Sequence, residues 1–151
     1  MPVFVTNQLI KTDIGSCWEF FSNPDNLSLI TPPDMRFRIR FPVPVPSMYA
    51  GMVIRYTVSP LMRIPLEWIT EITHVRKFEY FVDNQIKGPF RIWHHQHIFR
   101  QVPGGIEMID IVNYQVPFGI IGGLLANWLV RSRIEQIFRH RKAVIEGRFG
   151  N

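Results

Sequence analysis

The polar side chains that could carry chemistry recur at every second position in three consecutive stretches of the chain. His95 and His97 are separated by one residue. Asp83 lies in the preceding stretch, and Asp110 and Tyr114 lie in the following one. On a β-strand, residues two apart point to the same face, so each stretch would present its polar groups together. Adjacent strands lie about 4.8 Å apart, so neighbouring strands would bring these groups within reach of one another.

Three interpretations of this polar patch remain open. Histidine and aspartate can pair across strands and so fix the register of a sheet. An aspartate beside a histidine can instead tune the imidazole pKa towards neutral pH, as ligand recognition or acid–base catalysis requires. The spacing His95-x-His97 could also chelate a metal ion together with a nearby carboxylate. Because His-x-His arises often by chance, we expect no metal and no cofactor.

If these strand faces point into a cavity, the aromatic residues on them would form the walls of a binding site; the sequence leaves that orientation open, because both faces carry apolar residues. Small-molecule sites are mostly apolar, with a few polar groups in fixed positions. The residues expected to contact a ligand are Trp68, Phe81, Asp83, Trp93, His95, His97, Phe99, Asp110, Tyr114 and Trp128. If the protein is an enzyme, the expected catalytic residues are His95, His97 and Asp110. Tyr114 would then donate a hydrogen bond to a developing oxyanion.

The segments that must position these residues have the patterns of β-strands. Val3–Ile10 is rich in β-branched residues, and residues 35–41 alternate arginine with apolar residues. Further strands are predicted at residues 51–59, 64–75, 78–85, 91–102 and 105–116. Their short connections favour an antiparallel meander. Arg36, Arg38 and Arg40 are expected to form a solvated strand face.

Helices are predicted after the first strand and at the end of the chain. Ile14–Phe21 follows Thr12 and Asp13, which can cap a helix, and a second short helix begins near Asn23. From about residue 118 to residue 148 there is no proline, and apolar residues recur at helical spacing. A helix of about 30 residues would be about 45 Å long, which is enough to span a sheet.

The composition fits one folded domain over residues 1–151. Hydrophobic residues make up 46% of the chain and charged residues 19%, so a packed core is expected. Cys17 is the single cysteine, which excludes an intramolecular disulfide and a cysteine-based zinc site. The N-terminal segment lacks the pattern of a signal peptide, and residues 117–130 are too short for a membrane-crossing helix. We therefore expect a cytoplasmic protein without stable membrane insertion.

The net charge of +5 makes nucleic acid and anionic membranes partners to consider. The densest basic group lies on the predicted C-terminal helix and comprises Arg131, Arg133, Arg139, His140, Arg141 and Lys142. No recognised nucleic-acid-binding motif accompanies this group. We interpret it as a solvated helix face and expect no nucleic-acid partner.

Several short segments are typical of one superfamily. They are FFSNPDNL at residues 20–27, LITPP at 29–33, FVD at 81–83, GPF at 88–90, WHHQHIF at 93–99, DIVNY at 110–114 and PFG at 117–119. Through them the whole chain resembles the SRPBCC superfamily of START-like, polyketide cyclase and birch-pollen-allergen-like proteins, and in particular a bacterial ligand-binding group. The resemblance implies an α+β helix-grip fold. In that fold a seven-stranded curved antiparallel sheet wraps around one long C-terminal helix, with two short helices after the first strand.

The resemblance implies an internal cavity, and two functions follow from it. The first is binding, with transport or presentation, of a small hydrophobic or amphipathic molecule. The alternative is a cyclase- or dehydratase-type enzyme that uses a His/Asp pair in the same cavity. The superfamily also contains lipid carriers and hormone receptors, and a fold alone does not choose among them. The sequence leaves the oligomeric state open, because an exposed edge strand can either pair or be blocked.

Overall fold

The chain forms strands and helices in the order expected from its sequence. The strands are β1 (Val3–Ile10), β2 (Arg38–Phe41), β3 (Met52–Val58), β4 (Leu66–Arg76), β5 (Tyr80–Lys87), β6 (Ile92–Val102) and β7 (Gly105–Gln115). The helices are α1 (Ile14–Phe21), α2 (Leu27–Ile30) and α3 (Gly123–Phe149), with short 3₁₀ turns η1 (Pro24–Asn26) and η2 (Pro33–Met35). The structure is a computed structural model that describes residues 1–117 and 123–150.

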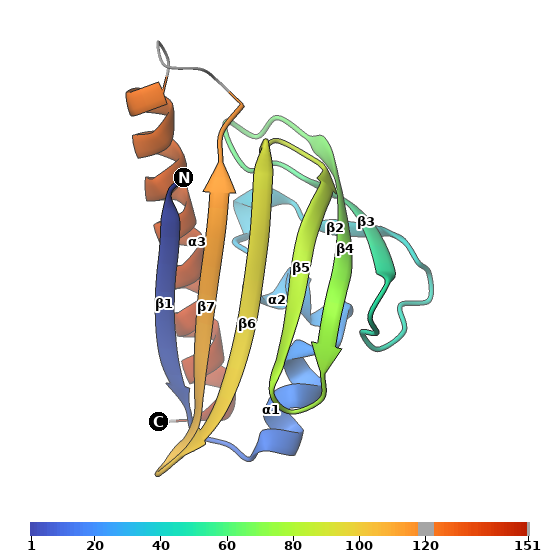
Figure 1. The fold of residues 1–151 in the computed structure, drawn as a ribbon, viewed down its shortest axis with the longest axis vertical. Coiled ribbons are helices and arrows are strands. Elements are labelled where there is room, and N and C mark those ends of the chain that lie inside the picture. The colour runs from blue at the N-terminus through green and yellow to red at the C-terminus, as the bar shows by residue number, and fades with distance from the viewer. Residues whose placement is uncertain (118–122, 151) are drawn as a thin grey trace.

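All seven strands lie in one antiparallel sheet, in the order β1-β7-β6-β5-β4-β3-β2. Strands β2 to β7 form a meander, and β1 pairs with β7 at the other edge. The long helix α3 runs behind β1 and β7, and the segment with α1 and α2 lies behind the rest of the sheet (Figure 1). The predicted helix-grip architecture is therefore confirmed.

The strand predicted at residues 35–41 is shorter than expected. Met35 belongs to η2, and Arg36 has a φ of 50°, in the left-handed region, so the extended backbone begins only at Arg38. Arg38 and Arg40 are exposed, as expected for a solvated face. The predicted start of the C-terminal helix at residue 118 lies outside the described residues, and α3 ends at Phe149, one residue beyond the prediction.

The helix α1 begins where a capping residue is available. The Asp13 carboxylate accepts hydrogen bonds from the Ser16 backbone N–H and from the Ser16 hydroxyl, both at 2.8 Å. Such caps satisfy a donor that would otherwise lack a partner. The helix buries Cys17, Trp18, Phe20 and Phe21 against the sheet. The Trp18 ring meets the Phe99 ring edge-on, with centroids 5.5 Å apart.

Alternation along β7 and helical spacing along α3 decide what faces the interior. Every second residue of β7 from Ile106 to Tyr114 is buried, and this places Asp110 on the inner face. On α3 the buried residues are Ile134, Phe138, Arg141 and Ile145. Their spacing puts them on one side of the helix, against the sheet.

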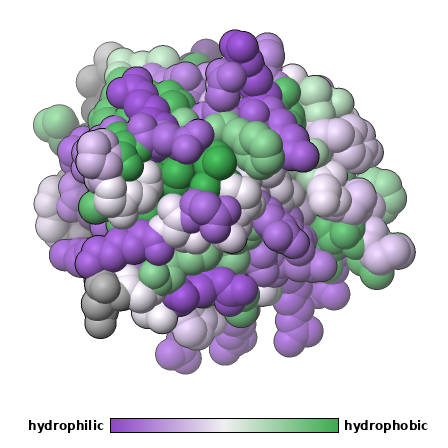
Figure 2. All heavy atoms as spheres, turned by 90° about the horizontal axis from the view of Figure 1, so that it is seen from below, coloured by the Kyte–Doolittle hydropathy of each residue, from purple (hydrophilic) through white to green (hydrophobic). Residues whose placement is uncertain are grey.

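The lower end of the molecule, near α1 and the β6–β7 turn, has a mixed exterior. Hydrophilic residues cover most of it, and hydrophobic residues gather in a small central group (Figure 2). Among residues 1–117 and 123–150, no helix combines the length and the apolar composition that crossing a membrane requires.

The β6–β7 turn depends on a glycine, and this gives a stability prediction. Gly105 has a φ of 150°, and a Cβ at this position would collide with the backbone carbonyl oxygen of Ile10. We expect Gly105→Ala to lower the free energy of unfolding by about 1–3 kcal/mol, because the backbone must shift or remain strained. Urea unfolding followed by circular dichroism measures the change.

Gly147 provides the matched control of opposite sign. It lies in α3, and a Cβ there would meet no atom within 4 Å. Gly147→Ala should raise the free energy of unfolding by about 0.5–1 kcal/mol, because alanine favours the helix. A Gly105→Ala chain as stable as the wild type would contradict the steric explanation.

Candidate functional site

A cavity of about 440 Å³ lies between the sheet, the α1–η2 segment and α3. Its walls are mostly apolar and come from every layer of the fold, for example Phe21 on α1, Ile54 on β3, Trp68 on β4 and Ile137 on α3. The volume falls in the range of about 300–1,000 Å³ that small-molecule sites occupy. The inner face of the sheet is therefore not fully covered by packed side chains.

The structure brings most of the predicted ligand-contacting residues to this cavity. Those that line it are Trp68, Phe81, Asp83, Trp93, His95 and His97. Asp110 touches both histidines but does not itself line the cavity. Phe99 packs instead against Trp18 and Phe21, next to the cavity wall.

Two predicted residues lie elsewhere. Tyr114 is buried in a separate apolar cluster with Phe4, Ile134 and Phe138, behind the cavity wall. Trp128 was expected to line the cavity, but its side chain is 65% exposed. It lies on the outward side of the first turns of α3, whereas its neighbour Leu129 lines the cavity.

The polar patch is a cluster of two histidines between two aspartates, which we call the His/Asp cluster: Asp83, His95, His97 and Asp110. In the sheet register Asp83 is opposite His95, and Asp110 is opposite His97. The shortest contacts run diagonally instead. Asp83 Oδ2 is 2.7 Å from His97 Nε2, and Asp110 Oδ1 is 2.9 Å from His95 Nε2.

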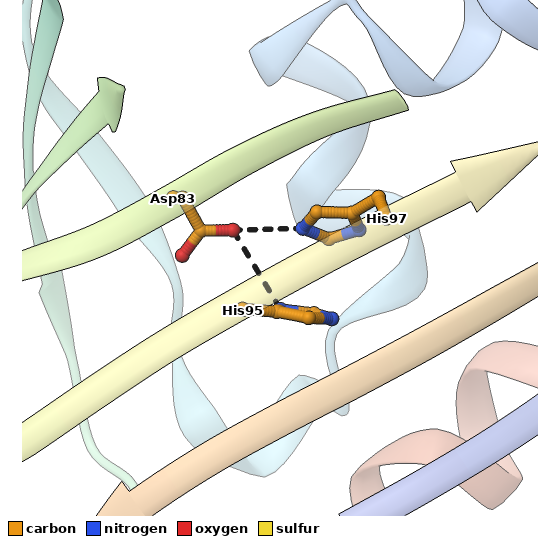
Figure 3. A group of neighbouring side chains, drawn as sticks. All are labelled: Asp83, His95 and His97. Atoms are coloured by element: carbon orange, nitrogen blue, oxygen red, sulfur yellow. Dashed lines mark hydrogen bonds and ion pairs between the residues drawn. The ribbon is translucent and has the colours of Figure 1, made fainter. Parts of the chain in front are cut away.

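Both aspartates also contact the second histidine. Asp83 Oδ2 is 3.6 Å from His95 Nδ1 (Figure 3), and Asp110 Oδ1 is 3.1 Å from His97 Nδ1. The latter contact is poorly aligned for a hydrogen bond, and His97 Nδ1 has no hydrogen-bond partner among the described residues. The two imidazole centroids lie 3.7 Å apart. Each histidine is therefore held between the same two carboxylates.

A fifth side chain, Arg141 on α3, completes the charge balance. Its Nη2 is 3.5 Å from Asp110 Oδ1, and its guanidinium lies over the rings of Phe21 and Phe138. Arg141 is only 8% exposed and lines the cavity. The prediction that all the basic residues of this helix form a solvated face is wrong for Arg141, and also for Arg133, whose side chain is 13% exposed and pairs with Asp34. The helical spacing of Arg141 relative to Ile134, Phe138 and Ile145 places it on the buried side of α3, and this spacing can be read from the sequence.

The pKa shifts follow from burial and from these contacts. Burial alone would raise the pKa of Asp110, but the Arg141 guanidinium and both histidines outweigh it and hold that pKa well below the usual value. The histidine contacts likewise outweigh burial at Asp83 and lower its pKa. Both aspartates are therefore carboxylates at neutral pH.

The two histidines shift in opposite directions. Burial and the neighbouring His97 lower the pKa of His95. Burial also lowers the pKa of His97, but its hydrogen bonding and electrostatic attraction to Asp110 and Asp83 outweigh burial, so the pKa of His97 is raised. His97 is thus the more basic of the two imidazoles. The Arg141 guanidinium and the more basic His97 both contact the carboxylates, and buried charges require such partners.

The remaining histidine of β6 lies outside this site. His94 points to the opposite face of the sheet, where its Nδ1 is 2.6 Å from Asn84 Oδ1.

Cys17 is not a candidate nucleophile, because burial raises the pKa of its thiol to about 12. A thiol with such a pKa is not a nucleophile at neutral pH.

Solved structures with the same fold cover almost the whole chain. Protein Ms6760 from Mycobacterium smegmatis aligns over 96% of this chain and 88% of its own, with a TM-score of 0.70 and 14% identity. TTHA0849 from Thermus thermophilus aligns over 97% and 98%, with a TM-score of 0.67 and 14% identity. Ara h 8.0201 aligns over 97% and 98%, with a TM-score of 0.65 and 10% identity.

At these identities the likeness shows the fold alone. It confirms the helix-grip fold that the sequence resemblance implies. No protein-family model matches the chain, and no curated protein matches it.

Proposed function

Starting from the helix-grip fold, we propose that this protein binds a small hydrophobic or amphipathic molecule in its internal cavity. The observation that carries the proposal is the mostly apolar cavity of about 440 Å³ with one polar cluster on its wall. Burying apolar ligand surface there would contribute roughly 25 cal/mol per Å². Transport or presentation of the bound molecule is consistent with a site that encloses its ligand.

The wall offers different surroundings to the two ends of an amphipathic ligand. The apolar body would lie against residues such as Ile54, Trp68 and Ile137. The polar end would meet Asp83 and Arg141, which provide an acceptor and donors at the cavity surface. A few polar groups of this kind fix the orientation of a ligand in an otherwise apolar site.

Two of the basic residues of α3, Arg133 and Arg141, are engaged within the fold, which favours a small molecule over a nucleic acid as the partner. Arg141 faces the cavity, and the Arg133 Nη2 donates to Asp34 Oδ2 at 2.6 Å. Arg133 Nε also donates to the carbonyl oxygen of Pro60 at 2.8 Å. These two side chains are therefore engaged within the fold and do not form a free face for phosphates.

Acid–base catalysis in the same cavity is the second candidate function. It is favoured by the opposite pKa shifts of His95 and His97, which share two carboxylates. Pairs of titratable groups whose environments separate their pKa values often divide the roles of acid and base. In this scheme His95 would accept a proton from a substrate, and His97 would donate one.

Native mass spectrometry of the purified protein tests the binding proposal directly. We expect an additional mass of a few hundred daltons, which solvent extraction would release for identification. The stripped protein should then bind the neutral dye N-phenyl-1-naphthylamine with increased fluorescence. A chain that carries no extra mass and does not bind the dye would contradict the proposal. Chemical conversion of the extracted molecule by native protein, absent in His95→Gln, would favour the enzyme.

A further inference from the structure

Three side chains of the His/Asp cluster offer ligand atoms that converge on one point of the cavity wall. Asp83, His95 and His97 each provide one such atom, and these atoms lie within 4.8 Å of one another (Figure 3). Two imidazoles and one carboxylate are ligands that first-row transition metals favour. We propose that these three residues bind a divalent transition metal ion at the wall of the cavity.

The spacing between the ligand atoms fits one ion. Asp83 Oδ2 lies 2.7 Å from His97 Nε2 and 3.6 Å from His95 Nδ1. Two ligands of a tetrahedral ion, each about 2.0–2.1 Å from the metal, are about 3.4 Å apart. Small rotations of the three side chains would reach that spacing, and the ion would replace the hydrogen bond between His97 and Asp83.

Asp110 supplies the outer support that metal-binding histidines require. Its Oδ1 is hydrogen-bonded to His95 Nε2 at 2.9 Å and lies 3.1 Å from His97 Nδ1, where a small rotation of the ring would align the second hydrogen bond. A ligating histidine almost always donates its other ring N–H to such a partner, which orients the ring and its lone pair. With Nε2–H donating to Asp110, His95 presents an unprotonated Nδ1 towards the Asp83 carboxylate.

The geometry leaves part of the coordination sphere open towards the cavity. Asp83, His95 and His97 line the cavity, whereas Asp110 does not. The three protein ligands would therefore hold the ion from one side, and water or a ligand oxygen could complete its shell, as in metal sites with an exchangeable position. The two nitrogen ligands select Zn²⁺, Co²⁺ or Fe²⁺ over Mg²⁺ and Ca²⁺, which prefer oxygen.

Titration of the chelator-treated protein with Co²⁺ tests the proposal. We expect one Co²⁺ per chain, visible d–d absorption of nitrogen-ligated cobalt, and a Kd of about 1 µM or below. Zn²⁺ should displace the cobalt, whereas Mg²⁺ should not. Asp110→Asn should weaken binding by ~10–100-fold. His95→Gln, His97→Gln and Asp83→Asn should each weaken binding at least as much.

His94→Gln is the matched control, because His94 lies on the same strand with its side chain on the opposite face. It should bind Co²⁺ as the wild type does. If a variant fails to fold, NMR of the wild-type protein tests the site instead. Co²⁺ should shift the imidazole signals of His95 and His97 and leave those of His74 and His140 unchanged. Wild-type protein that binds no Co²⁺, or binds it at His74 or His140, would overturn the proposal.

The cobalt titration uses the metal ion alone. Its outcome is therefore independent of whether the cavity binds a hydrophobic molecule, and the two proposals can fail separately.

Discussion

Asp110→Asn should lower the free energy of unfolding by about 3–5 kcal/mol, the usual effect of removing one partner from a buried charged pair. Asp110 is 5% exposed and contacts Arg141, His95 and His97 through one oxygen. Asparagine keeps the shape but not the charge, so the Arg141 guanidinium would stay buried without a counter-ion. Urea unfolding near neutral pH measures the loss.

Glu107→Gln on the same strand is the control for this variant. Glu107 lies towards the outer face, where it accepts a 3.3 Å hydrogen bond from Asn7. Its change should stay within about 0.5 kcal/mol, as is usual for surface sites. Adding Arg141→Met to Asp110→Asn should recover part of the lost stability, because the unpaired cation is removed. A loss below about 1 kcal/mol in Asp110→Asn would contradict a buried, charge-balanced cluster.

The same variant should differ from the wild type in its response to acid. Because the folded-state pKa of Asp110 is lowered, its carboxylate stabilises the fold above the unfolded value of 3.8. That contribution is lost as the pH falls below 3.8 towards the folded-state pKa. The stability difference between wild type and Asp110→Asn should therefore narrow in acid.

Ile137→Trp should reduce the affinity for N-phenyl-1-naphthylamine at least ~10-fold, equivalent to about 1.4 kcal/mol or more. Ile137 lines the cavity from α3 and is only partly buried. A tryptophan there would extend into empty space, so the fold should survive while the volume available to a ligand shrinks. Fluorescence titration of the stripped protein measures the affinity.

Ala143→Trp adds the same ring to an exposed position of α3 and should leave dye affinity unchanged. Circular dichroism should show that both variants keep the native secondary structure. If Ile137→Trp binds the dye as tightly as Ala143→Trp, the dye does not occupy the internal cavity. The cavity would then need another occupant, or the proposed binding function would be wrong.

Strand alternation predicts which polar residues share a strand face, but not whether that face points to the interior, because both faces carry apolar residues. The spacing of His95 and His97 places both on one face of β6, and Asp110 and Tyr114 share a face of β7 in the same way. That these faces are the buried ones is seen only in the structure. The diagonal contacts of Asp83 and Asp110 could not be predicted in this way. They depend on the register of β5, β6 and β7 and on the side-chain rotamers. The periodicity of a single strand gives no information about either.

Helix periodicity was a weaker guide for Arg141 and Trp128. A basic residue among other basic residues indicates a solvated face, yet Arg141 is buried because Asp110 on β7 neutralises it. Tryptophan is a large aromatic residue of the kind that is usually buried, yet Trp128 is exposed together with Leu124 and Leu125. Spacing gives the direction of a side chain around the helix axis, but not which turns of the helix the sheet covers.

The alternation of β6 limits how this sequence can change length during evolution. One residue inserted between Trp93 and His94 would slip the strand by one position and turn both histidines outward, with His94 and Gln96 in their place. The connection between β2 and β3 is mostly exposed and has no strand register to keep, and such loops tolerate insertions. Descendants that keep this site should therefore vary in length at residues 42–51 and conserve the spacing along β6.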